Sequence, residues 1–488
     1  MAKRPTPDDA TREDLRREIA HLRDDLTRAE QARDQAERER ARLERERDRL
    51  QRERDRLQGQ LDAARRAGFR QAAPFAKAHR QGTGRPAGRR AGAAYGRHAH
   101  RPRPRRIDET HEARLPATCP GCGDGITPTH VATQYQEDLP PVRPVVRACR
   151  VAVGTCRGCG RRVQGRHALQ TSDALGAAGT ALGPRATALA VWLHKGLGLP
   201  LGKVRRVLAT QHGLAVTRGG LVHLCARTAA RAAPTYEALC AEVRGSPVVT
   251  PDDTGWKVGG VLHWLWVAVT PTTTVFRIAP GRGVDDAAAL LGADFAGILV
   301  RDGWVVYRRF TQATHQTCLA HLLRRCRLLR GDHPRSPLPR QIQARLQQAL
   351  ALRDRAAAGD VSPHGLAVAR GQLFQQILDV LTTTRSTVPD VQRFAAHLTT
   401  EAGALLTFLG EPAVDATNWR AEHAIRPAVV TRKVCGGNRT ARGAETQQIL
   451  ASVLRTLDQR GLDPTDVLTP LLHARQPIVA PALRLPPT

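Results

Sequence analysis

Val248-Val249-Thr250-Pro251-Asp252 begins the stretch that decides the fold, because the residue pattern changes there from helical to extended. β-branched and aromatic residues at this density favour β-strands, and two more such runs follow. They are 261–269 (VLHWLWVAV), behind a turn at Gly259-Gly260, and 274–278 (TVFRI). The sequence therefore predicts a meander of three antiparallel strands.

A helix and a fourth strand follow this meander. Residues 285–291 are expected to form a short helix, and 297–302 (GILVRD) a buried strand that ends in a carboxylate. This order is that of the ribonuclease-H-like fold, in which the first and fourth strands are neighbours. We therefore expect Asp252 and Asp302 to face each other at the end of the sheet.

Glu422 is the best candidate for a third carboxylate. Two metal ions about 3.5–4 Å apart need bridging and flanking oxygen ligands around a scissile phosphate, so two aspartates are not enough. Glu422 lies in 418–427 (NWRAEHAIRP), where we expect a helix that ends at Pro427 and places Arg426 on the face of Glu422. A single such acid is usually a cap or a surface charge, so the inference depends on all three together.

Length and charge set the class of protein. A chain of 488 residues is expected to contain two to four structural units. Its 75 Lys and Arg against 45 Asp and Glu give a net charge of +30, which indicates a polyanionic partner, DNA above all, unless it only reflects an Arg-rich proteome. No apolar run that could be a signal peptide begins in the first ten residues. The most apolar stretch, 186–193, ends at His194 and Lys195 and is too short to span a membrane. We expect a cytoplasmic, nucleoid-associated protein that is neither secreted nor membrane-bound.

Residues 1–68 are predicted to form a coiled coil. Helix-forming residues dominate, and apolar side chains recur at spacings of three and four. These are Leu15, Ile19, Leu22, Leu26, Ala29, Ala36, Leu43, Leu50, Leu57, Leu61 and Ala64. Arg33, Arg40, Arg47 and Arg54 occupy the alternate seam positions, so a single solvated helix is the other interpretation. A coiled coil would make the chain a homo-oligomer.

Residues 69–115 are interpreted as a basic, disordered arm. Between Phe69 and Thr110 there are 11 Lys or Arg against 2 Asp or Glu, set among Gly, Ala, Pro and Gln with little to bury. Such an arm would neutralise DNA phosphates without reading bases. The alternative is a solubilising linker.

Residues 116–168 carry the pattern of a zinc ribbon. Cys119-Pro-Gly-Cys122 and Cys156-Arg-Gly-Cys159 are each followed by Gly, and 33 residues separate the pairs. Four thiolates in two such knuckles suit the tetrahedral preference of Zn²⁺, whereas chance pairs or a redox motif are the alternatives. Cys149 lies outside the pattern.

Residues 169–246 are predicted to be helical and to resemble a helix-turn-helix. A helix over 201–211 is followed by a break at 212–216, and Thr217 is a plausible N-cap for a second helix through Thr228. Arg218, at the start of that helix, is then a candidate DNA contact. Ordinary packing of two helices explains the same pattern.

These features together resemble the insertion sequence 66 (TnpC-like) family of transposases, from the arm almost to the C-terminus. The matching motifs are Pro74-Phe75, Gly84-Arg85-Pro86, the knuckles at Cys119 and Cys156, Pro251-Asp252-Asp253-Thr254, Val300-Arg301-Asp302-Gly303-Trp304 with Tyr307, Cys318-Leu319-Ala320-His321 with Arg324-Arg325, Asn418 to Pro427, Arg432-Lys433, Gly436-Gly437, Arg439, Arg442-Gly443-Ala444 and Gly461-Leu462-Asp463-Pro464.

The resemblance implies a DDE catalytic triad of Asp252, Asp302 and Glu422 that binds Mg²⁺ (or Mn²⁺). It places these acids in a ribonuclease-H-like domain over 247–440, with a helical insertion at about 311–410 and a helical tail over 441–488. It also implies element ends and target DNA as partners, together with companion proteins of the same element. The family usually has Asp-Glu-Thr where this chain has Asp252-Asp253-Thr254. We choose Asp252 over Asp253 on the alignment of the motif, since only one of two adjacent strand residues points at the metals.

Two further groups of residues have two interpretations each. Arg432, Lys433, Arg439 and Arg442, beside the turn at Gly436-Gly437, either hold DNA phosphates or form a solvated basic loop. Cys318 and His321, one helical turn apart, are either half of a second metal site or structural, and we leave them out of the catalytic set.

The expected function is metal-dependent cleavage and strand transfer of insertion-sequence ends. Three alternatives stay open: a DNA-binding regulator or inactive relic, a nuclease without strand transfer, and a scaffold assembled by the coiled coil.

Overall fold

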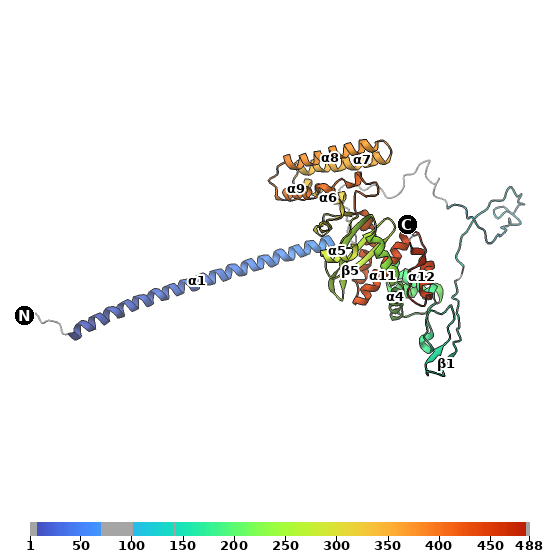
Figure 1. The fold of residues 1–488 in the computed structure, drawn as a ribbon, viewed down its shortest axis with the longest axis horizontal. Helices are drawn as coiled ribbons and strands as arrows, with labels where there is room; N and C mark the ends of the chain where they lie inside the picture. Colours follow the sequence, from blue (N-terminus) through green and yellow to red (C-terminus); the bar gives the residue numbers. More distant parts are fainter. Residues whose placement is uncertain (1–6, 70–100, 141, 485–488) are drawn as a thin grey trace, which may run out of the picture. The chain divides into compact units, whose positions relative to one another are not determined.

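The computed structural model describes residues 7–69, 101–140 and 142–484. The chain divides into two compact units, residues 1–88 and 89–488, each with its own architecture (Figure 1). Most of the expected basic arm, residues 70–100, lies outside the described residues.

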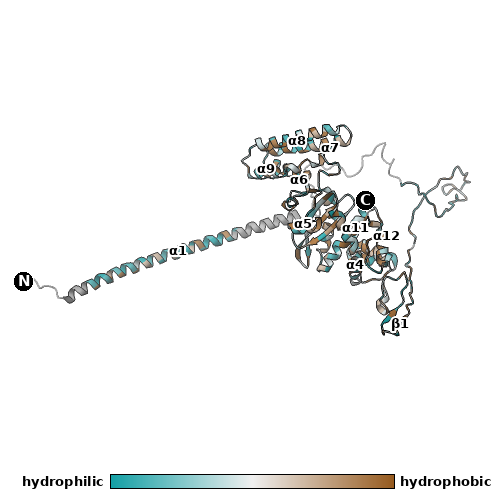
Figure 2. Cartoon of the chain, in the orientation of Figure 1, coloured by the Kyte–Doolittle hydropathy of each residue, from teal (hydrophilic) through white to brown (hydrophobic). Residues whose placement is uncertain are grey.

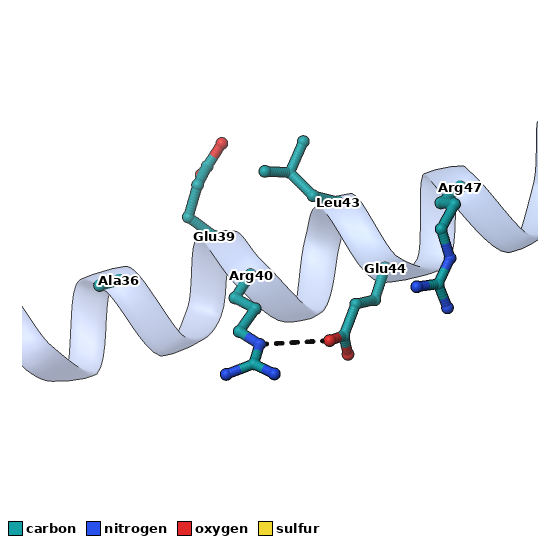
Figure 3. Close-up of a pocket in the computed structure, with 6 residues that line it drawn as sticks. All are labelled: Ala36, Glu39, Arg40, Leu43, Glu44 and Arg47. Atoms are coloured by element: carbon teal, nitrogen blue, oxygen red, sulfur yellow. Dashed lines mark hydrogen bonds and ion pairs between the residues drawn. The ribbon is translucent and has the colours of Figure 1, made fainter.

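The first unit is built on one helix, α1 (Pro7–Phe69), of 63 residues. Hydrophilic residues dominate it (Figure 2). Between Leu15 and Leu50 its large apolar side chains are exposed, with Leu15 at 53% and Leu22 at 60%. Ion pairs such as Arg40–Glu44, at 3.2 Å, run along its surface beside Leu43 (Figure 3). The helix is confirmed, and its pairing with a second copy stays a prediction.

The second unit begins with an extended segment and a small hairpin. In residues 101–140 and 142–152 the structure has neither helix nor strand. β1 (Val153–Thr155) and β2 (Arg162–Gln164) then pair antiparallel around the second cysteine pair. A 3₁₀ turn, η1 (Gly176–Gly179), follows.

Four helical elements come next. They are α2 (Pro184–Val191), the π-helix η2 (Trp192–Gly196), α3 (Leu201–His212) and α4 (Arg218–Arg244). The Thr217 side chain accepts a hydrogen bond from Gly220 N and caps α4, as the sequence predicts. However, α4 continues 16 residues past Thr228, with Pro234 inside it, because its buried face packs against the rest of the unit. The DNA-binding role of this helix pair stays a prediction.

A five-stranded mixed sheet forms the centre of the unit, in the order β5-β4-β3-β6-β7. β3 (Val248–Val258), β4 (Val261–Val269) and β5 (Thr274–Ala279) are the predicted antiparallel meander. α5 (Val284–Leu291) is followed by β6 (Ile298–Arg301), then by η3 (Val305–Arg309) and β7 (Thr314–Thr317). β6 pairs in parallel with β3, and β7 pairs in parallel with β6. The mixed α/β architecture is confirmed, and β7 is an addition to the sequence prediction.

Alternating side chains separate the two faces of the sheet. On β4, Trp266 and Ala268 join the core formed with α2, α4, α5 and α11, whereas Leu265 and Val267 join the core under α10. Successive residues of a strand point to opposite faces, so both faces of β4 are buried.

The helical insertion between β7 and α10 has its own core. It consists of α6 (Leu319–Asp332), α7 (Leu338–Ala357), α8 (Pro363–Thr383) and α9 (Pro389–Glu401), followed by the short turns η4 (Ala402–Ala404) and η5 (Thr407–Leu409). α7 packs against α6 and α8 (Figure 1). Leucine, isoleucine and phenylalanine side chains fill this core, which meets the sheet at Val300.

The C-terminal segment belongs to the core rather than forming a tail. α10 (Trp419–Cys435) covers β3 and β4, and α11 (Ala441–Gln459) packs against β5 and α4. α12 (Pro464–His473) packs against α2, and η6 (Pro481–Leu483) follows. In the described part of the chain, no helix is long and apolar enough to cross a membrane.

Candidate active site

Asp252 lies within β3, not at its end. The strand runs six residues further, to Val258, because β4 pairs with it throughout 250–258. Its parallel pairing with β6 covers only Val248 and Val249. Asp252 therefore lies just beyond the last residue of β3 that pairs with β6. We expected it near the end of this pairing, because the first and fourth strands were predicted to be neighbours.

Asp252 and Asp253 point to opposite faces of the sheet. Asp252 is opposite Val267, which packs under α10, and Asp253 is opposite Trp266, on the other face. Asp253 forms an ion pair with Arg282 at 2.7 Å, and its side chain is 3% exposed. Asp253 thus has a cation partner within the protein.

Asp302 follows the last residue of β6. One of its carboxylate oxygens, Oδ1, accepts a hydrogen bond from Trp304 N at 3.0 Å. The bond turns the chain after the strand, and Trp304 then stacks on the guanidinium of Arg282 at 4.0 Å. The predicted placement of Asp302 at a strand end is confirmed.

Glu422 lies in the first turn of α10, which begins after Asn418. The helix does not end at Pro427 but continues to Cys435, so this expectation was wrong. A proline in a helix removes one hydrogen bond, yet packing of Ala421, Ala424, Ile425 and Val429 against the core holds α10 together. The Glu422 side chain is 20% exposed and lies 3.7 Å from Nε2 of His321.

The three carboxylates act on one another electrostatically. The pKa of Asp252 is raised to about 8, mainly by burial and in smaller part by the charges of Asp302, Asp253 and Glu422, while a hydrogen bond from Asp253 N opposes the rise. Burial also raises the pKa of Tyr307 strongly, with added effects of Asp253, Asp252 and Asp302. Asp302, at the end of β6, and Glu422, on α10, therefore lie near enough to Asp252 on β3 to act on its carboxyl group.

Polar atoms without partners surround this site. Tyr307 Oη, His321 Nδ1 and both side-chain polar atoms of Asn418 are buried and lack a hydrogen-bond partner. Such groups are rare in folded proteins and mark places where a ligand, ion or water completes the structure. Sequence reasoning left His321 aside, although its spacing from Cys318 was the available signal. Cys318 itself is buried and lies near Asn418.

The donor set fits Mg²⁺ or Mn²⁺ in chemistry. All three predicted ligands, Asp252, Asp302 and Glu422, are carboxylates, and oxygen ligands are those that these ions prefer. Among the described residues, however, no group of three or more His, Cys, Asp or Glu has the spacing of a metal site. Like charges repel, so these carboxylates are not expected to converge without a cation.

The basic loop after α10 is fixed to the end of β3. Arg432 donates to Thr254 Oγ1 at 3.2 Å, and Asn438 accepts a hydrogen bond from Trp256 Nε1 at 2.8 Å. Gly437 has φ of 110° and lies against the Lys257 carbonyl, where a side chain would clash. Lys433, Arg439 and Arg442 are exposed around this anchored loop. Arg218, far earlier in the chain, is exposed at the start of α4.

The two cysteine knuckles have the same local geometry. In each, the amide of the first cysteine donates to the carbonyl five residues on, and the glycine after the second cysteine donates back, at 2.8–2.9 Å. These glycines, Gly123 and Gly160, have φ of 80° and 67°. Hydrogen bonds from Gly121 and Cys122 lower the pKa of Cys119, and those from Cys159 and Gly158 lower that of Cys156. The described structure does not bring the pairs into one four-cysteine group.

Comparison with known proteins identifies the family of this chain. The family model described as "Transposase IS66 family" matches residues 179–446, a range that contains Asp252, Asp302 and Glu422. Because the match covers more than half of the chain, the protein belongs to the IS66 transposase family.

Two similar proteins come from Sinorhizobium fredii (strain NBRC 101917 / NGR234), and both are described as uncharacterized. Protein y4qI is 27% identical over 235 residues, which are 43% of each chain. Protein y4jD is 25% identical over 396 residues, which are 74% of this chain and 75% of that protein. The present chain thus spans less than half of y4qI and three quarters of y4jD.

Proposed function

We propose that this chain is a DDE-type transposase that cuts the ends of an insertion sequence and joins them to target DNA. The observation that carries the proposal is the electrostatic effect of Asp302 and Glu422 on the buried Asp252, from elements far apart in sequence and inside the range that matches the transposase family. The strand order, with three antiparallel strands and two that run parallel to the first, supports a ribonuclease-H-like catalytic domain.

In this proposal the three carboxylates hold two Mg²⁺ (or Mn²⁺) ions. Such ions activate the attacking oxygen and stabilise the leaving oxygen of an in-line displacement at phosphate. The burial that raises the pKa of Asp252 is a cost that a bound cation offsets, which favours its role as a ligand. His321 lies near Glu422 and would orient it, while Arg432, Lys433, Arg439 and Arg442 would hold the DNA backbone.

The remaining parts are proposed to bind DNA and partners. The knuckles at Cys119, Cys122, Cys156 and Cys159 would hold one structural Zn²⁺, and the hydrogen bonds that lower two of their thiol pKa values support this. The α3–α4 pair with Arg218 and the basic arm would contact DNA, α1 would join copies of the chain, and companion proteins of the element would assist.

Isosteric variants of the triad test the proposal. Asp252→Asn, Asp302→Asn and Glu422→Gln should each lower Mg²⁺-dependent nicking and joining of end-containing DNA at least about 10³-fold, since each removes a metal ligand. DNA affinity and melting temperature should stay close to those of the wild type. The measurement is a gel assay at matched protein concentration.

Asp253→Asn is the matched control, because Asp253 lies on the other face of β3 and is paired with Arg282. It should keep most of the activity. Wild-type rates from Asp302→Asn or Glu422→Gln would refute the DDE assignment. An active Asp252→Asn beside an inactive Asp253→Asn would move the first ligand by one residue.

A further inference from the structure

Glu401, the last residue of α9, forms a buried ionic cluster with the residue that precedes Asp302. Its carboxylate is fully buried, pairs with Arg301, accepts a hydrogen bond from Thr317 Oγ1 at 2.5 Å, and lies 2.8 Å from Arg308 Nε. Arg301 is itself 2% exposed, and its Nη1 also donates to the Asp302 carbonyl at 3.1 Å. A single carboxylate from the helical insertion thus fixes the end of β6.

The same helix contacts the residue after Asp302. A Cβ added at Gly303 would lie 2.6 Å from Cε1 of His397, which is one turn before Glu401 on α9. No side chain at position 303 fits against this ring without a shift. α9 therefore touches the chain on both sides of Asp302, through Glu401 at Arg301 and through His397 at Gly303.

We propose that α9 is the positioning element for Asp302, with Glu401 as its positioning residue and with the His397 ring packed against Gly303. The inference rests on the proposed function, in which Asp302 is a metal ligand. It gives the helical insertion a role in building the metal site. The position of a metal ligand at the end of a short strand depends on the residues that hold this end in place. Replacing residues that contact and orient a metal ligand commonly lowers metal affinity about 10–100-fold.

Glu401 is the residue of this cluster whose replacement is expected to disturb it most, because its carboxylate pairs with both arginines. Burial by itself raises the pKa of Glu401, but Thr317 and the two arginines lower it below its usual range, so the group is a carboxylate. Glu401→Gln would leave Arg301 buried without its counter-charge, and Arg301 would then shift the backbone that carries Asp302.

Glu242 offers a matched control in the same chain. It pairs with Arg460 at 2.6 Å and accepts from Thr273 Oγ1 at 2.7 Å, with its side chain 15% exposed. The chemistry of Glu, Arg and Thr is the same, but this cluster joins α4 to the end of α11. Glu242→Gln should destabilise the protein without changing metal binding.

Mn²⁺ binding to the full-length protein, followed by the electron paramagnetic resonance signal of free Mn²⁺, is the test. We expect Glu401→Gln to weaken binding at least about tenfold. Glu242→Gln should bind as wild type, even at an equal loss of melting temperature. Asp302→Asn should abolish one binding event and so calibrate the assay. Wild-type Mn²⁺ affinity in a folded Glu401→Gln protein would overturn the inference.

A second pair of variants keeps the test decisive if Glu401→Gln does not fold. Gly303→Ala should weaken Mn²⁺ binding because the new Cβ pushes against His397, and the double variant with His397→Ala should restore it. Equal binding by Gly303→Ala and wild type, or no rescue by the second change, would refute the role of α9. If wild type and Asp302→Asn bind Mn²⁺ alike, the proposed metal site itself fails, whatever the α9 variants do.

Discussion

His194 shows how one residue couples folding to pH. It lies in the π-helix η2, and its Nδ1 is 2.8 Å from the carbonyl oxygen of Leu199, to which a neutral imidazole donates. Its pKa is lowered to about 4, mainly by burial and in smaller part by the charge of Lys195, while the Leu199 carbonyl opposes the shift. The folded protein therefore holds His194 neutral at pH values where the unfolded chain protonates it.

The direction of the pH effect follows from this shift. The folded pKa lies below the unfolded value of about 6.5, so the contribution is present above pH 6.5 and is lost as the pH falls toward 4. We expect the loss to reach at most about 2 kcal/mol at pH 5. His194→Gln should reduce the drop in melting temperature between pH 7 and pH 5. Exposed His223→Gln should leave that drop unchanged, and equal drops in both variants would contradict the prediction.

At this scale the sequence predicted the identity of the acids better than their surroundings. Asp252, Asp302 and Glu422 stand in motifs that local pattern reveals, and in the structure Asp302 and Glu422 act electrostatically on Asp252. The partners of Glu422 and of the neighbouring Asp253 come from distant segments: His321 for Glu422 and Arg282 for Asp253. Such contacts depend on the tertiary fold, which the spacing of residues along the chain does not specify.

At the scale of elements, the edge strand β5 is closed by side chains of α11. Gln448, Ser452 and Thr456 accept hydrogen bonds from the amides of Ile278, Phe276 and Thr274, at 2.8–3.1 Å. Four helical residues rise about 6 Å and two strand residues about 6.6 Å, so the two periods match. This arrangement protects an edge that would otherwise pair with another chain.

Ser452→Ala tests the closure of this edge. It leaves the buried Phe276 amide unsatisfied, which is expected to cost about 1–3 kcal/mol. The melting temperature should fall, and hydrogen exchange at Phe276 should become faster. Thr446→Ala is the control, because its hydroxyl donates only within α11, to Arg442 at 2.8 Å. Unchanged exchange at Phe276 in Ser452→Ala would show that the hydroxyl is dispensable.

The cysteine knuckles give a second prediction for an element. Two turns of the same geometry, each with its cysteines at the start and a glycine of positive φ at the end, are expected to bind about one Zn²⁺ per chain. Cys156→Ser should release the metal, as measured by elemental analysis of the purified protein. Cys149→Ser changes an exposed thiol outside the pattern and should retain it. Full zinc content in Cys156→Ser would exclude this ligand set.

Elements were predictable where their pattern is periodic. The meander, α5 and β6 follow from runs of β-branched and apolar residues, and α4 from its Thr217 cap. β7 was missed because its sequence, THQT, contains no apolar residue. Tertiary hydrogen bonds hold it instead, since the Gln316 side chain donates to Leu405 O and accepts from Phe408 N.

At the scale of the whole molecule, α1 is expected to determine self-association. Its 63 residues span about 95 Å at 1.5 Å per residue, and the seam leucines between Leu15 and Leu50 are exposed in the single chain. The apolar seam of an isolated helix stays in contact with water and adds little to its stability, whereas pairing with a second copy of α1 would bury the seam. The weakness lies in the middle, where Arg40 and Arg47 hold seam positions and pair with acids of their own helix.

Replacing these seam arginines should therefore strengthen the association. In Arg40→Leu/Arg47→Leu, two charged seam positions become apolar, and the dissociation constant measured by analytical ultracentrifugation should fall at least about tenfold. Arg38→Leu/Arg45→Leu makes the same change in composition on the opposite side of α1 and should have little effect. If both pairs of changes act alike, general hydrophobicity rather than a heptad seam drives the association, and α1 is a solvated helix.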